Sequence, residues 1–245
     1  MPDENQKQHN PISNLGAVVL CGGKSTRLGI DKSQLDFGGR TFLEEVVSQV
    51  RQVCRSVVVV GNSDLSCHRL PDDVLMARDE AIDKGPLEGI RVGLKRLKPG
   101  LATEKLPQDV SRKAQRAGCE FAFVTSCDAP LLKPELIRFL FEHLEGHAAI
   151  VPVQGDRIFG MTAIYRTRLH VDIGNRINAG SLRVSDLASA LDAHCIDAES
   201  LRASDSNLDS LTNINSVSDY REFLETTGLT CPADLAKLIG LNDSV

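Results

Sequence analysis

The chain has 245 residues, of which 42% are hydrophobic, and is therefore long enough to bury one sizeable core or two small ones. Its 28 basic and 33 acidic residues leave a formal net charge of −5, which argues against a general nucleic-acid-binding or membrane-surface protein. No apolar run approaches the ~20 residues that span a bilayer, and residues 1–14 are polar, so they predict a disordered leader and not a secretory signal.

The first predicted element is a short buried strand over residues 17–20, followed by a glycine-rich loop. Gly22 and Gly23 have no Cβ atoms, so backbone N–H groups of this loop can approach an anion closely. Three cations follow: Lys24, Arg27 and Lys32. The loop matches neither the Walker phosphate loop nor the dinucleotide-binding fingerprint, because Val18 and Lys24 stand where those motifs need glycine. We interpret it as a site for a polyanionic small molecule, most simply a nucleoside triphosphate.

Helical and strand patterns alternate along the rest of the chain. Thr41 and Glu44 have the spacing of a capping box at a helix start, and Pro86 and Pro134 suit the first turns of two later helices. We expect helices over 42–50, 86–97, 134–144, 167–176, 181–190 and 217–224, and a small one after residue 229. We expect strands over 57–60, 74–77, 121–124, 148–151, 161–165, 194–196 and 211–214.

The predicted strands are mostly continuous apolar runs, which is typical of a parallel sheet that is covered on both faces. Because strands and helices also alternate, we predict an α/β fold: a single doubly wound, mostly parallel sheet with helices on both faces. We expect one domain over residues 15–228, with a surface insertion over 98–118 and a C-terminal tail over 229–245.

Leu20 through Lys32 match the pattern L-x-G-G-x-S-x-R-x-G-x-D-K. This pattern resembles that of the NTP-transferase family and, within it, that of the molybdenum cofactor guanylyltransferases; the resemblance covers nearly all of residues 15–226. It implies a Rossmann-like nucleotidyltransferase fold and an Mg²⁺-dependent enzyme. Such an enzyme transfers GMP from GTP to the molybdopterin-bound molybdenum cofactor and releases pyrophosphate. Molybdoenzyme apo-proteins or cofactor chaperones are open as further partners.

Candidate site residues follow several of the predicted strands, and in open α/β sheets ligands bind beyond the carboxyl ends of the strands. These strand ends carry Gly22, Gly23, Asn62, Asp79, Asp128, Asn213 and Asn215. Asp128 comes just after an apolar strand and precedes Ala-Pro, so a stiff turn presents its carboxylate. One carboxylate that faces a phosphate loop suits Mg²⁺, which prefers few carboxylates together with phosphate oxygens and water. A turn aspartate that accepts local N–H bonds is the alternative.

Lys32 is the cation that we expect to act in catalysis, because a fixed ammonium stabilises the charge that develops on the α-phosphate and on departing pyrophosphate. Arg27 suits the β- and γ-phosphates, since a guanidinium binds two oxygens at once. Lys24 remains open between a phosphate contact and a solvated side chain. The resemblance implies that Asp128 is the Mg²⁺ ligand. It also implies nucleotide contacts for Lys32 and for the loop residues Leu20, Cys21, Gly22 and Gly23.

The base and the acceptor have separate candidate residues, which the resemblance implies. Those for the base and ribose are Asp79, Gly85, Pro86 and Leu87, the last three in the family's G-P-L-x-G segment. Those for the acceptor are Arg183, Asn213 and Asn215. A simple helix-start turn at Gly85, a helix cap at Asn215 and an ordinary surface role for Arg183 remain open.

Two departures from the family pattern leave base and acceptor specificity open. Residues 159–163 stand where family members usually carry His-Pro before a strand, and Val60 stands where the family has a nucleoside-contacting asparagine. The alternatives are a related cytidylyltransferase or sugar-nucleotide pyrophosphorylase, and a non-catalytic nucleotide-binding regulator.

Seven cysteines without a C-x-x-C pair indicate neither a zinc framework nor a disulfide scaffold, so we expect free thiols in a reducing cytoplasm. Cys127 lies next to Asp128 and is the one candidate nucleophile. No histidine is close to it in the sequence to activate the thiol, so we expect a small packing residue instead.

Overall fold

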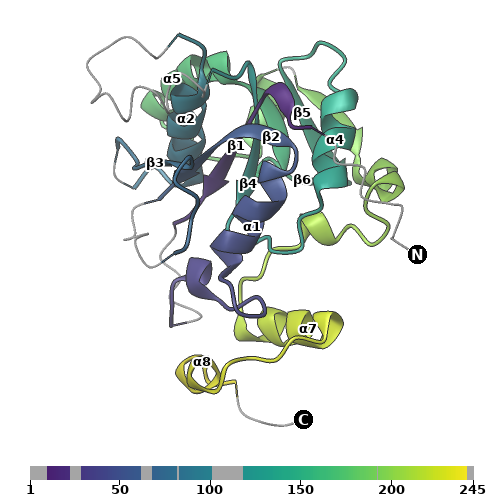
Figure 1. Ribbon diagram of the computed structural model, residues 1–245. Coiled ribbons are helices and arrows are strands. Elements are labelled where there is room, and N and C mark those ends of the chain that lie inside the picture. Colours follow the sequence, from purple (N-terminus) through teal and green to yellow (C-terminus); the bar gives the residue numbers. More distant parts are fainter. Residues whose placement is uncertain are drawn as a thin grey trace.

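The computed structural model describes residues 10–22, 29–61, 68–81, 83–100, 118–191 and 193–241 (Figure 1). These residues form an eight-stranded sheet in the order β3-β2-β1-β4-β7-β5-β6, with β8 beside β5. The strands are β1 (Ile12–Leu20), β2 (Cys54–Val60), β3 (Leu75–Ala77), β4 (Phe121–Ser126), β5 (Ala149–Gln154), β6 (Arg157–Ile158), β7 (Ala163–Arg166) and β8 (His194–Asp197). In the described part of the chain, no helix is long and apolar enough to cross a membrane.

Helices cover both faces of this sheet. The helices of the described residues are α1 (Phe42–Arg51), α2 (Pro86–Leu97), α4 (Pro134–Glu142), α5 (His170–Asn178), α6 (Asp186–Ala190), α7 (Val217–Thr227) and α8 (Ala233–Ile239). Short 3-10 turns are η1 (Lys32–Gln34), η3 (Thr167–Leu169), η4 (Ala198–Ala203) and η5 (Asp209–Leu211). The helices α1 and α4 share one hydrophobic core with the sheet, and α2, α5 and α6 share the other. Figure 1 shows α7 and α8 extending below the sheet as a separate pair.

The sheet has a parallel half and a mixed half. β1 pairs in parallel with β2 and β4, and β2 pairs in parallel with β3. β7 is antiparallel to both β4 and β5, so β5 again runs in the direction of β4, and β8 pairs with β5 in parallel. The predicted α/β fold, with a mostly parallel sheet and helices on both faces, is confirmed.

The central strand β1 is buried on both faces because its side chains alternate between the two cores. Ala17 and Val19 belong to the core under α1 and α4, whereas Val18 and Leu20 belong to the core under α2. Helix α2 packs closely on β1 at Gly93, where a Cβ atom would lie 2.4 Å from Val18 Cγ1. The continuous apolar run therefore forms the middle of the sheet and holds the start of the glycine-rich loop in place.

Local sequence signals define the helix starts. Thr41 Oγ1 accepts a hydrogen bond from the Glu44 N–H and the Thr41 N–H donates one to the Glu44 carboxylate, so the predicted capping box is confirmed. The capping box of Ser216 and Asp219 opens α7 in the same way. The expected prolines stand in the first turns of α2 and α4. These caps satisfy N–H groups that the helix itself leaves unpaired.

A third hydrophobic cluster joins the two C-terminal helices to the beginning of the chain. Its buried members are Leu35, Phe42, Ile214, Tyr220, Phe223, Leu224 and Ile239. The rings of Phe42 and Phe223 lie 5.2 Å apart between centroids, and the Tyr220 hydroxyl donates to the Asp36 carbonyl at 3.0 Å. The helix expected after residue 229 is α8. Because Ile239 is buried in this cluster, the predicted C-terminal tail packs on the segment that follows the glycine-rich loop.

The strand expected over 211–214 is wrong. Leu211 ends the 3-10 turn η5 and packs in the core under α1 and α4, whereas Ile214 packs in the third cluster with Tyr220. The Ile214 N–H bonds to the Asp128 carbonyl oxygen at 2.8 Å, outside any strand ladder. The two apolar residues therefore belong to two different cores, and Asn213 and Asn215 do not stand at a strand end.

Several boundaries differ from the expected ones, and one short strand was not expected. The first strand begins at Ile12, whose N–H donates to the Val53 carbonyl, so residues 12–14 belong to the sheet and not to a leader. The helix expected over 181–190 is only α6, because Ser181 N–H closes the end of α5 by bonding to the Arg176 carbonyl. The two-residue strand β6 was not predicted, since so short a segment has no periodicity to detect. Most of the expected 98–118 insertion lies outside the described residues.

Candidate active site

Lys32, Asp128 and Asn215 meet at one point, although they are far apart in the sequence. The Lys32 ammonium donates a hydrogen bond to Asp128 Oδ2 at 2.8 Å across 96 residues of sequence, and a second one to Asn215 Oδ1 across 183 residues. The Lys32 and Asp128 side chains are 19% and 9% exposed. A largely buried ion pair of this kind is costly to desolvate and is held in place by its surroundings. We call these three residues the Lys32 centre.

Asp128 is fixed by main-chain hydrogen bonds on both sides. The Cys127 N–H donates to the Leu20 carbonyl at 2.9 Å, which extends the β1–β4 ladder by one step beyond β4. The Ala129 N–H closes a turn on the Ser126 carbonyl, and the Asp128 carbonyl accepts from Ile214. The carboxylate is therefore presented at the carboxyl end of β4, next to the end of β1, as the sequence predicted.

The second carboxylate oxygen of Asp128 has the chemistry to bind a metal ion. Asp128 Oδ1 is buried and has no hydrogen-bond partner among the described residues. A buried polar atom without a partner costs about 1–3 kcal/mol, so such atoms are rare outside functional sites. A carboxylate oxygen is the ligand that Mg²⁺ prefers, and Lys32 occupies only Oδ2. Asp128 therefore suits the role of a metal ligand. Within the described residues, neither of its side-chain oxygens accepts an N–H group of its own turn, so the alternative of a turn-capping aspartate is not supported.

Asn215 is oriented by the start of α7. Its N–H donates to Asp219 Oδ2 at 2.8 Å, and Asp219 also receives the Ser216 N–H at 3.0 Å. Burial opposes the charged form of Asp219, but these hydrogen bonds and the nearby Lys32 outweigh it and lower the pKa of the carboxyl. Ser216 is the N-cap of α7, so the alternative of Asn215 as the cap is wrong. The Asn215 side chain instead bonds Lys32 through Oδ1, and its Nδ2 donates to the Asn213 carbonyl at 3.3 Å.

The strand ends that carry the glycine-rich loop are packed tightly together. The Cys21 N–H donates to the Val60 carbonyl at 2.7 Å, and the Gly61 N–H donates to the Ala77 carbonyl. At Gly61 a Cβ atom would lie 1.9 Å from the Cys21 carbonyl oxygen, so only glycine fits there. Leu20 and Cys21 are buried and offer a ligand only their backbone, whereas Gly22 is exposed. Gly23, Lys24, Arg27 and Asn62 lie outside the described residues.

Cys127 packs against Cys21 beneath this loop. The hydrogen bond between the two thiols and the burial of Cys127 both raise the pKa of Cys127 well above its ordinary value. A thiol that resists ionisation is a poor nucleophile. Cys127 is also one of the buried members of the core under α1 and α4, as expected for a packing residue.

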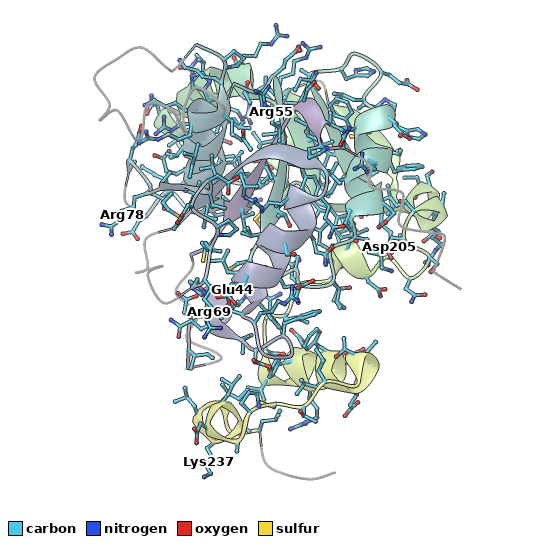
Figure 2. The ribbon with its side chains drawn as sticks, viewed as in Figure 1. Glu44, Arg55, Arg69, Arg78, Asp205 and Lys237 are labelled. Carbon is cyan, nitrogen blue, oxygen red and sulfur yellow. The ribbon has the colours of Figure 1, made fainter. Side chains whose placement is uncertain are left out.

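A histidine that the sequence reasoning missed links the Lys32 turn to α1. Ser33 Oγ lies 3.2 Å from His68 Nε2, and Thr41 Oγ1 lies 3.0 Å from His68 Nδ1. Burial lowers the pKa of His68, against the opposing effect of nearby carboxylates, which favours the neutral ring that can serve both hydroxyls. Figure 2 shows Glu44 beside Arg69 at the beginning of α1, where Glu44 accepts the Arg69 N–H. No sequence pattern marked His68, because its partners are distant in the chain.

The predicted base-side residues lie at the start of α2. A Cβ atom on Gly89 would lie 3.7 Å from Asp79 Oδ1, so the Asp79 carboxylate faces the first turn of this helix. Gly85 has a φ of +66°, which glycine adopts readily, and a Cβ there would meet no atom of the described residues within 4 Å. Leu87 is fully buried in the core under α2, so its side chain contributes packing.

Glu88 holds this part of the site together, and the sequence reasoning did not single it out. Its Oε1 accepts the N–H groups of Glu80 and Ala81, each at 3.1 Å, directly after Asp79. Arg91 donates to both carboxylate oxygens of Glu88 at 2.7 Å. Glu88 is 1% exposed, so its charge is stabilised almost entirely by these four bonds. The only signal in the sequence was a glutamate at the variable position of G-P-L-x-G with an arginine three residues later.

Glu80 completes the network at the surface. It accepts hydrogen bonds from Arg91 at 2.7 Å and from Lys95 at 2.9 Å. These bonds lower the pKa of Glu80 to about 2. Glu80 and Ala81, which directly follow Asp79, are therefore tied to Glu88, Arg91 and Lys95 of α2.

Arg183 is exposed, in the segment between α5 and α6. Its carbonyl accepts from the Asp186 N–H at 3.3 Å, and the neighbouring Val184 packs against the core under α2. The structure therefore gives no contact that links Arg183 to the Lys32 centre among the described residues. Its acceptor role stays a prediction.

Comparisons with known proteins agree with this geometry. Residues 17–194 match the family model described as the MobA-like NTP transferase domain. The chain is 34% identical over 212 residues to a protein of Mycobacterium avium named "probable molybdenum cofactor guanylyltransferase", covering 84% of this chain and 93% of that protein. It is 29% identical over 200 residues to the molybdenum cofactor guanylyltransferase of Desulfosudis oleivorans, covering 81% and 88%.

The fold is also that of a solved structure, molybdopterin-guanine dinucleotide biosynthesis protein A from Archaeoglobus fulgidus. The TM-score is 0.67 at 21% identity, covering 87% of this chain and 98% of that chain. The match to the family model includes the glycine-rich loop, the Asp79 and α2 segment and Asp128. This chain belongs to the MobA-like NTP transferase family.

Proposed function

We propose that this protein transfers GMP from GTP to the terminal phosphate of molybdopterin carrying molybdenum and releases pyrophosphate. The observation that carries the proposal is the contact of Lys32 with Asp128, with Asp128 Oδ1 left unpaired, at the carboxyl ends of β1 and β4. This is the edge of an α/β sheet at which ligands bind. The names of the two relatives given above, one of them 34% identical, support the choice of guanylyl transfer.

The chemistry needs positioning and charge stabilisation more than proton transfer. The acceptor phosphate is already an anion, so it can attack the α-phosphorus in line with the departing pyrophosphate without a general base. Lys32 would place its ammonium next to the phosphate oxygens on which charge develops. Asn215 and Asp128 hold that ammonium in one position. No bond between enzyme and nucleotide forms in this scheme.

We propose Mg²⁺ as the cofactor and Asp128 as its protein ligand. A bound Mg²⁺ would neutralise developing negative charge on the phosphate oxygens. The backbone at Leu20, Cys21, Gly22 and Gly23 and the Arg27 side chain would hold the remaining phosphate oxygens.

The two substrates would lie on different sides of the Lys32 centre. The base and ribose would lie beside Asp79, Gly85 and Pro86, at the start of α2, where the Asp79 carboxylate faces Gly89. The acceptor would meet Asn213 and Asn215, with Arg183 as a further phosphate contact. Molybdoenzyme apo-proteins or cofactor chaperones would then receive the product.

A pyrophosphate-release assay with GTP, Mg²⁺ and molybdenum-loaded molybdopterin tests the proposal. We expect release that depends on both substrates and that Asp128→Ala abolishes. A folded protein that binds GTP but releases no pyrophosphate under these conditions would instead be a nucleotide-binding regulator.

Nucleotide choice is tested separately by the thermal shift that each nucleotide produces with Mg²⁺. At a given concentration, a ligand that binds the folded state more tightly raises the melting temperature more. We expect a larger shift with GTP than with CTP. A shift with CTP alone would favour a cytidylyltransferase and contradict the guanylyl proposal.

A further inference from the structure

Glu145, His147 and His194 form a cluster of metal-ligating side chains outside the site described above. Each offers one ligand atom, and these atoms all lie within 4.8 Å of one another. The two imidazole rings are 5.1 Å apart between centroids. Glu145 and His147 are exposed and His194 is half-buried, so an ion from solvent can reach all three.

The cluster lies at the opposite edge of the sheet from the Lys32 centre. Asp128 follows the carboxyl end of β4, whereas Glu145 and His147 precede the amino end of β5, which runs in the same direction as β4. His194 is the first residue of β8, the parallel neighbour of β5. Because the two sites lie at opposite edges of the sheet, one bound ion cannot contact residues of both.

The main chain holds the two histidines in place. The His147 N–H donates to the Leu144 carbonyl at 2.9 Å, and its carbonyl accepts from Arg166 Nε at 3.3 Å. Arg166 also donates to the Gly146 carbonyl at 3.1 Å, so one guanidinium fixes the turn that carries His147. His194 is paired opposite Ile150 in the sheet. The ligands therefore stand on two adjacent, hydrogen-bonded segments.

Arg166 lies near the cluster, but its positive charge is paired and does not repel a bound cation. Arg166 forms a salt bridge with Glu120 and lies over the Phe121 ring at 4.7 Å. Its remaining donors point to the two carbonyls named above. Among the described residues, no hydrogen bond or salt bridge occupies the Glu145 carboxylate, so it is available to a bound ion.

We propose that Glu145, His147 and His194 bind one divalent transition-metal ion of the zinc class, at a site separate from nucleotidyl transfer. Two imidazoles and one carboxylate are a ligand set that Zn²⁺ uses, with water in the fourth position. Mg²⁺ prefers oxygen ligands, so it does not compete for two imidazole nitrogens. A bound ion would clip the turn before β5 to the start of β8.

Titration of the metal-stripped full-length protein with Zn²⁺ in excess Mg²⁺, followed by calorimetry, tests this site. We expect one equivalent of Zn²⁺ to bind, and we expect Co²⁺ to give the visible spectrum of a low-coordinate site. His147→Gln and His194→Gln should each weaken binding by at least about tenfold. The same variants should lose the rise in melting temperature that Zn²⁺ produces in the unchanged protein.

Three matched variants complete the test. His143→Gln changes a nearby histidine whose Nδ1 bonds the Phe139 carbonyl at 2.8 Å, and should bind Zn²⁺ normally. Cys195→Ser removes the exposed thiol next to His194 and should also bind normally. Asp128→Asn should bind Zn²⁺ as the unchanged protein does, which separates this site from the proposed Mg²⁺ site. The proposal would be overturned if the unchanged protein failed to bind Zn²⁺, or if both histidine variants bound Zn²⁺ as tightly as the unchanged protein does.

Discussion

The Lys32 centre and the Glu88 network each contain a buried carboxylate that is paired with a cation, but the two differ in what is left unpaired. Glu88 receives four hydrogen bonds, shared between both of its oxygens, from Arg91 and from the N–H groups after Asp79. Asp128 receives a bond from Lys32 on Oδ2, while Oδ1 has no partner among the described residues. A fully bonded carboxylate stabilises the fold, whereas one with an unused oxygen is prepared for a ligand.

A second structural ion pair supports this distinction. Lys133 donates to Asp205 at 2.6 Å, and the other oxygen of Asp205 accepts the Ser210 N–H at 2.8 Å. Figure 2 labels Asp205 near the lower end of α4. Both oxygens of Asp205 are bonded, as in Glu88. Among these three lysine- or arginine-bound carboxylates, only Asp128 keeps an oxygen for another group.

The largest effect is expected from Asp128→Asn. Losing the proposed metal ligand should lower kcat for pyrophosphate release by about 1,000-fold, because charge stabilisation of the transition state is lost. The free energy of unfolding should fall by about 1–3 kcal/mol, because the amide keeps an oxygen for the Lys32 bond but removes the negative charge that pairs with the ammonium. The measurements are steady-state kinetics and urea unfolding. Asp156→Asn, in the exposed turn between β5 and β6, is the control; near-normal activity of Asp128→Asn would contradict the distinction.

Lys32→Met should lower kcat by about 100-fold, because the ammonium beside the reacting phosphate is lost. Lys32→Arg should recover only part of the activity, since a planar guanidinium does not reproduce the point charge of an ammonium. Lys133→Met is the matched control: it breaks a lysine–aspartate pair of the structural kind, so stability should fall while kcat stays. If Lys32→Met and Lys133→Met lowered kcat equally, the Lys32–Asp128 and Lys133–Asp205 pairs would not differ as we infer.

Glu88→Ala should mainly reduce stability. It leaves Arg91 and two N–H groups without their buried partner, which we expect to cost about 3 kcal/mol in urea unfolding. In the folded variant, the KM for GTP should rise more than kcat falls, because the Asp79 segment is no longer tied to α2. Glu199→Ala removes a fully exposed glutamate that also pairs with an arginine three residues later, Arg202, and should leave both quantities unchanged. A lower kcat with an unchanged KM would place Glu88 at the reacting phosphates instead.

The smallest effect concerns acid unfolding. Hydrogen bonds from Arg91 and Lys95 lower the pKa of Glu80 from 4.5 to about 2 in the folded protein. The stability from this shift is present above pH 4.5 and is lost as the pH falls from about 4.5 towards 2. Because Glu80 is 41% exposed, solvent screening keeps the effect below about 1 kcal/mol. Urea midpoints measured across this range should fall less steeply for Glu80→Gln than for the unchanged protein; parallel curves would count against the network.

Much of the site could be predicted because its residues stand next to strong local patterns. The glycine-rich loop follows a strand that is apolar throughout, and Asp128 follows another, so both were placed at the carboxyl edge of the sheet. Glu88 and His68 escaped prediction for a different reason. A buried glutamate and a buried histidine look like ordinary helix and loop residues until their partners, such as the N–H groups after Asp79 or the hydroxyls of Ser33 and Thr41, are known.

The sequence by itself determined what depends on neighbours within a few residues: the capping boxes of α1 and α7, the proline-led helices α2 and α4, and the apolar strands β1, β2 and β4. Only the tertiary structure decided the antiparallel entry of β7, the division of Leu211 and Ile214 between two cores, and the meeting of Lys32 with Asp128 and Asn215. Short-range order follows from backbone geometry and hydrophobic periodicity, which the chain carries locally. Contacts across 96 and 183 residues depend on how whole elements pack, and no local pattern records that.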